Sequence, residues 1–395
     1  MANGNITGIA AGTTTITATA TADGQTATET VTVTVNPNTG SKVGALLNTS
    51  SGSAWVEIDL NSVDGNQNLT KIEVKNKIEG LNPVGGGYAD DKLWGAVSKD
   101  LYAFDNGVNG TKVTTMDSGD NVIDLTDAPK ITTGSQSIED PANAVFATYS
   151  GQIGVLKSGG THTLLWDAGG DFRISAITYV GNLRAAQAGL TNCDNNTVCR
   201  VYYALSKDTA NGATLRQIIL VPTADANGNI SYSLHGTTIG TVAEFTDIKT
   251  SGAVKSTSMD FLDMGDNGFG LLVARSDKFG TNFIYYIDLT NYSVGTDENA
   301  LTVKKIGALT SVNETPINSF SALYHTDGAK MTDEQILKIA GWGQTSTDTL
   351  APQSAPVAAR AVSVQANGDT TDPAASTTKQ IEVPIYAADP ATNGK

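Results

Sequence analysis

A short apolar phrase that ends in serine recurs along this chain, and its spacing constrains the fold more than any other feature. The clear copies are LWGAVS at residues 93–98, VFATYS at 145–150, YYALS at 202–206 and LLVARS at 271–276, and a weaker fifth copy covers 321–327. The serines that end the four clear copies lie 52, 56 and 70 residues apart. A repeat of roughly 45 to 55 residues that holds several short strands is typical of β-propeller blades.

The repeat predicts an all-β fold, a β-propeller of about six blades with a range of five to seven, over residues 51–345. Residues 55–60 and 71–74 alternate apolar and polar side chains, which indicates two outer strands of a blade. Because the first strands of a propeller often complete its last blade, we expect these two strands to close the ring and leave no exposed edge.

Composition agrees with an all-β chain and excludes several functions. Charged residues make up 16% of the sequence, and Gly, Thr, Ser and Asn supply the turns and pleated surfaces that such a fold needs. The formal net charge of −15 leaves no basic patch for nucleic acid. The sequence contains no apolar run of about 20 residues, so we predict no membrane span.

The first residues form a separate unit. Residues 3–36 alternate Thr with Ile, Ala and Val around an Asp23-Gly24 turn, which predicts an antiparallel hairpin. This stretch resembles the C-terminal half of a group 2 bacterial immunoglobulin-like (Big2) domain. The matching residues are Gly4, Ile6, Thr7, Gly8, Gly12, Thr13, Ile16, Thr17, Ala18, Val31, Val33 and Val35.

The resemblance implies a partial immunoglobulin-like β-sandwich at residues 1–36, which would be a spacer on an exported bacterial surface protein. We therefore expect a secreted or cell-surface location. No signal peptide pattern follows Met1, and the front half of the domain is missing, so we expect the chain to begin downstream of its natural start.

The remaining segments follow from local signals. Residues 37–50 begin with Pro-Asn-Thr-Gly-Ser and predict a linker. Thr332 and Gln335 match a capping box, which predicts one short helix at 333–340 within the propeller. Residues 346–395 predict a Thr/Ala/Pro-rich linker with a terminal strand at 380–386.

Two cysteines occur in the whole sequence, Cys193 and Cys199. They are close enough in sequence to close a small disulfide loop at the tip of a blade, and no second Cys or His pair accompanies them to hold a metal. We predict a disulfide, which implies an oxidising compartment and agrees with export.

The best candidate metal site is an acidic loop. Asp260, Asp263 and Asp266 recur every three residues beside an Asn-Gly turn. Oxygen-rich acidic loops are the kind of site that Ca²⁺ prefers, so calcium is the cofactor that the sequence leaves open. The alternative interpretation is that these aspartates only stabilise a turn. A similar sequence, DSGDN at 117–121, occupies a different position relative to its copy of the repeat, so the two loops are not equivalent.

Other candidates have weaker support. The three histidines His162, His235 and His325 have no motif spacing, and we interpret each as a residue of a blade surface. Gly85–Gly87 lacks the context of a phosphate loop and predicts a tight turn between blades. Asp90 and Asp91 are candidates to face the central channel, but we interpret the pair as solvated turn residues. The aromatic residues of the repeats are mostly expected to pack between blades. These are Trp94, Tyr102, Phe104, Tyr202, Tyr203, Tyr285 and Tyr286.

No catalytic signature is present, so the leading hypothesis is a propeller displayed outside a bacterial cell that binds a glycan or an extracellular protein. Two alternatives stay open. One is a structural subunit of a surface layer or filament, a homo-oligomer formed by strand exchange at 1–36 and 380–386. The other is a carbohydrate-active hydrolase or lyase that uses channel-facing carboxylates.

Overall fold

The computed structural model describes residues 42–340 apart from short gaps, together with the backbone of four further strands. The gaps are residues 79–80, 105–109, 117–120, 134–137, 168–172, 191–193, 210, 246–253, 265–267, 278–280, 293–300 and 326–329. The further strands are β1 (Gly12–Ala22), β2 (Gln25–Val35), β26 (Val357–Ser363) and β27 (Gln380–Ile385).

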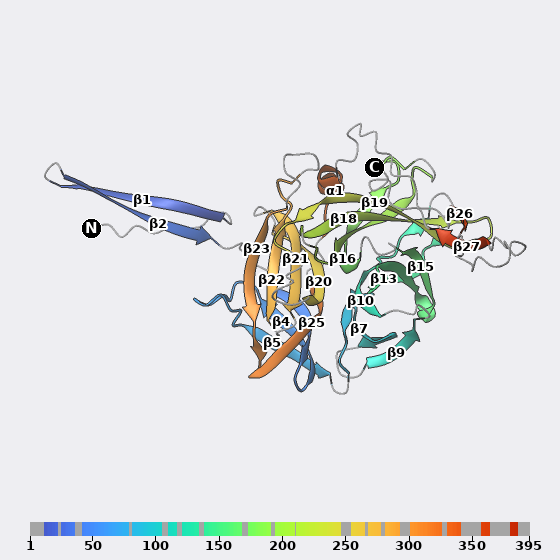
Figure 1. Ribbon diagram of the computed structural model, residues 1–395, viewed down its shortest axis with the longest axis horizontal. Helices are drawn as coiled ribbons and strands as arrows, with labels where there is room; N and C mark the ends of the chain where they lie inside the picture. The colour runs from blue at the N-terminus through green and yellow to red at the C-terminus, as the bar shows by residue number, and fades with distance from the viewer. Residues whose placement is uncertain are drawn as a thin grey trace, which may run out of the picture.

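Five antiparallel sheets form a propeller within residues 42–325 of this described part (Figure 1). From the innermost strand outward, blade 1 is β6 (Gly85–Ala89), β7 (Lys92–Val97), β8 (Asp100–Phe104) and β9 (Gly110–Thr115), and blade 2 is β10 (Val122–Asp127), β13 (Ala142–Thr148), β14 (Gln152–Lys157) and β15 (His162–Asp167). Blade 3 is β16 (Ile174–Arg184), β17 (Val198–Ser206), β18 (Ala213–Ala224) and β19 (Ile230–Val242), and blade 4 is β20 (Val254–Asp263), β21 (Phe269–Asp277), β22 (Asn282–Asp288) and β23 (Val303–Leu309). Blade 5 is β25 (Thr315–His325), β3 (Lys42–Thr49), β4 (Gly52–Asp59) and β5 (Ile72–Ile78), with the short β24 (Ser311–Val312) beside β25.

The innermost strands lie side by side around the ring in the order β6, β10, β16, β20 and β25, and β25 returns to β6. The predicted all-β propeller is thus confirmed, with five blades. Our preferred number of six was too high because blade 3, which spans residues 174–242, is longer than the usual repeat. The outer strands β18 and β19, for example, contain 12 and 13 residues.

Blade 5 closes the ring with strands from both ends of the propeller. β25 pairs with β3 from Ile317 opposite Thr49 to His325 opposite Val43. The predicted strands at 55–60 and 71–74 are present as β4 and β5, and they complete this last blade as expected. The predicted linker at 37–50 is wrong from Lys42 onward, because these residues form β3.

The four clear copies of the repeat lie on the second strands β7, β13, β17 and β21, and each final serine falls within two residues of the end of its strand. The fifth copy, at 321–327, occupies a different position, because it overlaps the innermost strand β25. The second strand of blade 5 is β3, whose last residue is Thr49 in place of the repeated serine.

A separate apolar cluster fills each of the five interfaces between neighbouring blades in the described part of the chain. Ile219 and Phe261 pack in the interface of blades 3 and 4, and Phe146 packs between blades 1 and 2. These three side chains are fully buried. A fully buried side chain of this size contributes about 1.5 to 3 kcal/mol, so the ring is stabilised through the contact of each blade with its two neighbours.

The glycines at residues 85–87 belong to a strand, and our prediction of a turn there is wrong. They form most of β6, which packs directly on the backbone of β10. A Cβ atom on Gly85 would lie 2.2 Å from the carbonyl oxygen of Ile123, and one on Gly87 would lie 1.6 Å from that of Leu125. These two positions require glycine because the two backbones touch.

The predicted helix is present as α1 (Asp333–Ala340). Its capping box forms as expected: the Thr332 N–H donates to Oε1 of Gln335 at 2.8 Å, and the Gln335 N–H donates to Oγ1 of Thr332 at 3.3 Å. Ile336 is buried against blade 3, and the N–H of Met331 donates to the carbonyl oxygen of Val180. The helix therefore fixes the chain after β25 to β16.

The outlying strands form two separate hairpins. β1 pairs with β2 along its whole length, and this hairpin lies apart from the ring in Figure 1. The hairpin agrees with the strands predicted at residues 3–36, but no third strand of a sandwich joins it among the described residues. β27 covers most of the predicted terminal strand and pairs with β26 of the same chain. No described helix combines the length and apolar character that crossing a membrane requires.

Candidate functional site

All five blades contribute to one cavity where their innermost strands meet, which we call the axial cavity. Its volume is about 410 Å³, within the usual range of small-molecule sites. Apolar, aromatic and charged side chains line it together. They are Trp55, Tyr88, Asp91, Leu125, Thr126, Asp127, Tyr179, Met259, Asp260, Leu323, Tyr324, His325 and Lys330.

Buried side chains on the innermost strands join neighbouring blades at regular positions. On β10 of blade 2, the Asp124 carboxylate accepts the N–H of Ile177 at 2.7 Å, and Oγ1 of Thr126 accepts the N–H of Tyr179 at 2.9 Å. Both acceptors thus satisfy backbone donors of β16, in blade 3. Burial raises the pKa of Asp124 well above its usual value, although the hydrogen bond from Ile177 opposes this effect.

Blade 4 uses the same arrangement toward blade 5. On β20, Oγ of Ser258 accepts the N–H of Leu323 at 2.9 Å, and the Asp260 carboxylate accepts the N–H of His325 at 2.5 Å. In blades 2 and 4 alike, two acceptors at alternate positions of an innermost strand pair with two donors of the next one. Buried N–H groups need such partners, so these side chains hold the innermost strands in register.

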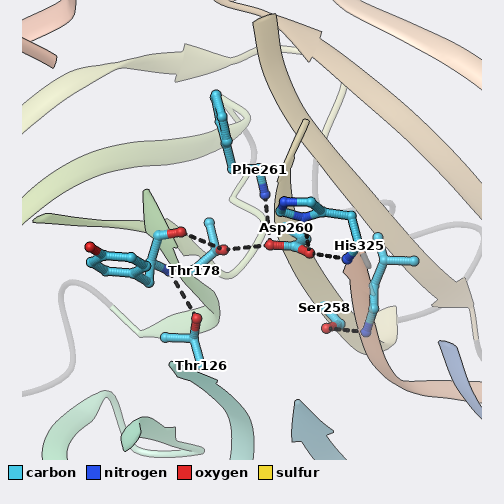
Figure 2. Close-up of polar contacts among 8 residues, drawn as sticks. Thr126, Thr178, Ser258, Asp260, Phe261 and His325 are labelled. Atoms are coloured by element: carbon cyan, nitrogen blue, oxygen red, sulfur yellow. Dashed lines mark hydrogen bonds and ion pairs between the residues drawn. The ribbon is translucent and has the colours of Figure 1, made fainter. Parts of the chain in front are cut away.

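Asp260 is the most connected of these residues, and Figure 2 shows it between β16 and β25. One carboxylate oxygen accepts the hydroxyl of Thr178 at 3.1 Å and the N–H of Phe261 at 2.8 Å. The other lies 2.6 Å from Nδ1 of His325. Burial opposes ionisation, but the charge and hydrogen bonds of His325, together with the charge of Lys330, outweigh burial and hold the pKa of Asp260 below its usual value. Asp260 is therefore a charged residue that joins three blades.

One wall of the axial cavity is aromatic. The rings of Tyr88 and Tyr324 stack with centroids 4.7 Å apart and an angle of 13° between their planes. The indole N–H of Trp55 donates to the hydroxyl of Tyr324. Lys330 places its ammonium group 4.8 Å from the ring centroid of Tyr179. The cavity thus offers flat apolar faces beside a cation.

Carboxylates lie beside the aromatic wall. Asp90 and Asp91 form the turn between β6 and β7 with positive φ angles of 51° and 56°. The N–H of Asp90 donates to the Asp127 carboxylate at 3.2 Å. Burial raises the pKa of Asp127 and the charge of Asp91 adds to this effect, while Lys330 acts in the opposite direction. The Asp90 and Asp91 side chains are both exposed, as expected of turn residues, and Asp91 also lines the axial cavity.

The predicted calcium ligands do not come together in the described residues. Asp260 and Asp263 are three residues apart on β20, and because successive residues of a strand point to opposite faces, these two side chains lie on opposite faces. Asp266 lies outside the described residues. The part of the chain that the structure describes contains no group of three His, Cys, Asp or Glu side chains that could hold a metal ion. Calcium at this loop stays a prediction.

The predicted disulfide also reaches beyond the described residues. Cys199 is buried on β17, with its Sγ 3.7 Å from the carbonyl oxygen of Thr197. Cys193 lies outside the described residues, so the pairing stays a prediction.

The interpretation of His325 as a blade-surface residue is wrong. His325 is buried at the ring centre, where it pairs with Asp260. The sequence gives no local signal for this pair because its members are 65 residues apart on strands of different blades. Asp127 and Lys330 were not predicted from the sequence either, because they reach the cavity only through the closure of the ring.

The fold and the cavity define a class: a five-bladed β-propeller with an aromatic and acidic cavity where its innermost strands meet. No protein-family model matches this chain, and no curated protein matches its sequence. One solved structure, the crystal structure of BBS1N in complex with ARL6DN, soaked with lead, is similar over 73% of this chain and 93% of that chain. The two are 11% identical in sequence with a TM-score of 0.27, so the likeness carries no argument about function.

Proposed function

We propose that this propeller binds a carbohydrate in the axial cavity. The observation that carries the proposal is the presence, in one cavity of about 410 Å³, of an aromatic wall together with carboxylates and a lysine. Sugar rings have apolar C–H faces that pack on aromatic rings. Their hydroxyl groups donate to carboxylates such as Asp91 and Asp127 and accept from the ammonium group of Lys330.

The arrangement of the cavity wall supports a built binding site. The stacked pair of Tyr88 and Tyr324 is fixed by the hydrogen bond from Trp55, so the aromatic wall is preformed. Asp90 and Asp91 are the two central residues of the β6–β7 hairpin, where both need positive φ, and this turn holds Asp91 at a defined place in the cavity wall. A rigid wall lowers the entropy that a ligand loses on binding.

A glycan array followed by isothermal titration calorimetry tests this proposal. Replacing Tyr88 by alanine should weaken binding of a captured glycan at least tenfold. Tyr102→Ala is the matched control, because both tyrosines are half-buried against the same apolar cluster and only Tyr88 lines the cavity. Lys330→Ala should also weaken binding with little effect on folding, because this side chain is exposed. Equal affinities of Tyr88→Ala and Tyr102→Ala, or an array without any captured glycan, would contradict the proposal.

A second candidate is carbohydrate hydrolysis, and the raised pKa of Asp127 favours it. Burial raises the pKa of Asp127, and a raised pKa makes a carboxyl group better suited to donate a proton to a leaving glycosidic oxygen. Asp260 is already engaged by His325, which leaves Asp91 as the second carboxylate of the cavity wall. Release of reducing ends from a bound glycan, abolished by Asp127→Asn, would establish this activity, whereas binding without turnover would leave recognition alone.

The biological setting is a proposal on different grounds. Display on an exported bacterial surface is supported by the resemblance of residues 3–36 to an immunoglobulin-like spacer. The filament alternative needs open strand edges. Among the described residues β27 pairs with β26 alone, so each strand of this two-stranded sheet keeps one open edge. Light scattering after size-exclusion chromatography, with and without millimolar calcium, distinguishes a monomer from a polymer and also tests the calcium prediction.

A further inference from the structure

A second cavity adjoins the axial cavity and shares part of its wall; we call it the rim cavity. Its volume is about 260 Å³. Tyr88, Asp91 and Asp127 line both cavities. The remaining residues of the rim cavity come from the turn after β6 and from blade 2. They are Asp90, Ala128, Pro129, Lys130, Ala142 and Asn143.

The two cavities differ in chemistry. The axial cavity has the stacked aromatic pair and buried apolar lining residues, among them Met259 and Leu323. The rim cavity has Tyr88 as its one aromatic residue, and its wall offers the carboxylates of the Asp90–Asp91 turn and the amide of Asn143. A continuous ligand that enters both therefore needs an apolar face at one end and hydroxyl groups at the other.

We propose that the two cavities are adjoining subsites for an oligosaccharide, with one sugar unit in each and the linkage beside Tyr88, Asp91 and Asp127. This inference rests on the proposed carbohydrate binding. Three shared residues make the cavities neighbours, so two linked units reach both without crossing solvent. The Tyr88 ring can contact both sugar units because it lines both cavities.

Charge narrows the ligand to neutral or amino sugars. Three carboxylates, those of Asp90, Asp91 and Asp127, line the rim cavity. Its lysine, Lys130, is paired at 3.0 Å with Glu139, which does not line the cavity. Acidic sugars such as uronic acids would meet net repulsion there, whereas hydroxyl or amino groups would find acceptors.

Calorimetry with matched sugar series tests the two subsites. The probes are glucose, maltose and cellobiose, and N-acetylglucosamine with its β1,4-linked dimer and trimer. In either the glucose or the N-acetylglucosamine series, we expect the disaccharide to bind at least tenfold more tightly than its monosaccharide. The trisaccharide should show no further large gain in affinity. Glucuronic acid and its dimers should bind more weakly than their neutral counterparts.

Variants separate the subsites. Asn143→Ala and Lys130→Ala, in the rim cavity, should lower the affinity for the dimer at least fivefold and change the affinity for the monomer less than twofold. Lys330→Ala, in the axial cavity, should weaken both ligands. Tyr102→Ala is again the control, because Tyr102 lines neither cavity.

Each outcome is decisive. Equal affinities for monomer and dimer, or rim-cavity variants that weaken both ligands alike, would overturn the two-subsite proposal while leaving carbohydrate binding in place. Binding of no sugar in either series or on the array would overturn the proposed function, and the subsites with it. The proportion of folded protein, measured by circular dichroism, must match the wild type for each variant compared.

Discussion

Replacing Asp260 by alanine would remove the side chain that joins three blades at the ring centre. The carboxylate accepts hydrogen bonds from Thr178, Phe261 and His325, and all of these contacts are buried. Alanine keeps the strand backbone of β20 unchanged. The substitution therefore isolates the contribution of these polar contacts to the stability of the ring.

The size of the effect follows from which partners lose an acceptor. Both the backbone N–H and Nδ1 of His325 lose Asp260, and removing one member of a buried ion pair costs about 3 to 5 kcal/mol. The Thr178 hydroxyl adds little, because it also lies 3.4 Å from the carbonyl oxygen of Tyr179. We expect the free energy of unfolding to fall by about 3 to 5 kcal/mol.

Equilibrium unfolding in urea measures this loss, with Asp59→Ala as the control. This substitution also removes a carboxylate, but the Asp59 side chain is 28% exposed. Its ion-pair partner, Lys71, lies 3.7 Å away at the surface. The control should lose less than about 1 kcal/mol. A loss of about 1 kcal/mol or less for Asp260→Ala would refute the idea that these contacts hold the ring together.

The pH dependence provides a second check. Because the pKa of Asp260 in the folded protein is below its usual value of 3.8, its charge stabilises the fold above that pH. This contribution is lost as the pH falls below 3.8 toward the folded pKa. The difference in stability between wild type and Asp260→Ala should therefore narrow as the pH falls. Asp124 shifts in the opposite direction but is present in both proteins, so its effect largely cancels.

Two further substitutions test the contact between β6 and β10 and the role of the acidic turn. Gly87→Ala places a Cβ 1.6 Å from the Leu125 carbonyl oxygen and should lower the free energy of unfolding by at least about 2 kcal/mol, measured in urea. Its control is Gly65→Ala, whose added Cβ would have no atom within 4 Å, so it should change the free energy of unfolding by less than about 0.5 kcal/mol. Similar losses of stability in the two variants would contradict the packing of β6 on β10. Replacing Asp90-Asp91 by Asn-Gly should stabilise the turn by up to about 1 kcal/mol in a thermal melt while it weakens sugar binding, because Asn-Gly suits positive φ and Asp91 leaves both cavities. A gain in both stability and affinity would contradict a binding role for Asp91.

The architecture was predictable where the signal was local. Repeated phrases ending in Ser98, Ser150, Ser206 and Ser276 mark equivalent strands because each blade uses the same antiparallel order. The helix was predictable because Thr332 and Gln335 satisfy each other's backbone donors within three residues.

The sequence concealed features that depend on partners distant in the chain. Lys42–Thr49 follows a Pro-Gly-Ser stretch and lacks the repeated serine, so only its pairing with β25, more than 260 residues later, identifies it as a strand. Glycine is disfavoured within strands, and Gly85–Gly87 are tolerated because they allow close contact with β10. The axial cavity needs residues from all five blades, and no local spacing reports that convergence.

The way in which β25 closes the ring also determines how the propeller would respond to mechanical tension. Val43, near the start of β3, lies opposite His325, at the end of β25. A force that pulls the chain before β3 away from the chain after β25 therefore acts on the same end of an antiparallel pair. Such a pair unzips one hydrogen bond at a time, and its first rung is the one that Asp260 ties to blade 4. If α1 detached from blade 3, the contact between Asp260 and His325 would be the first contact within the ring to be stretched by the force.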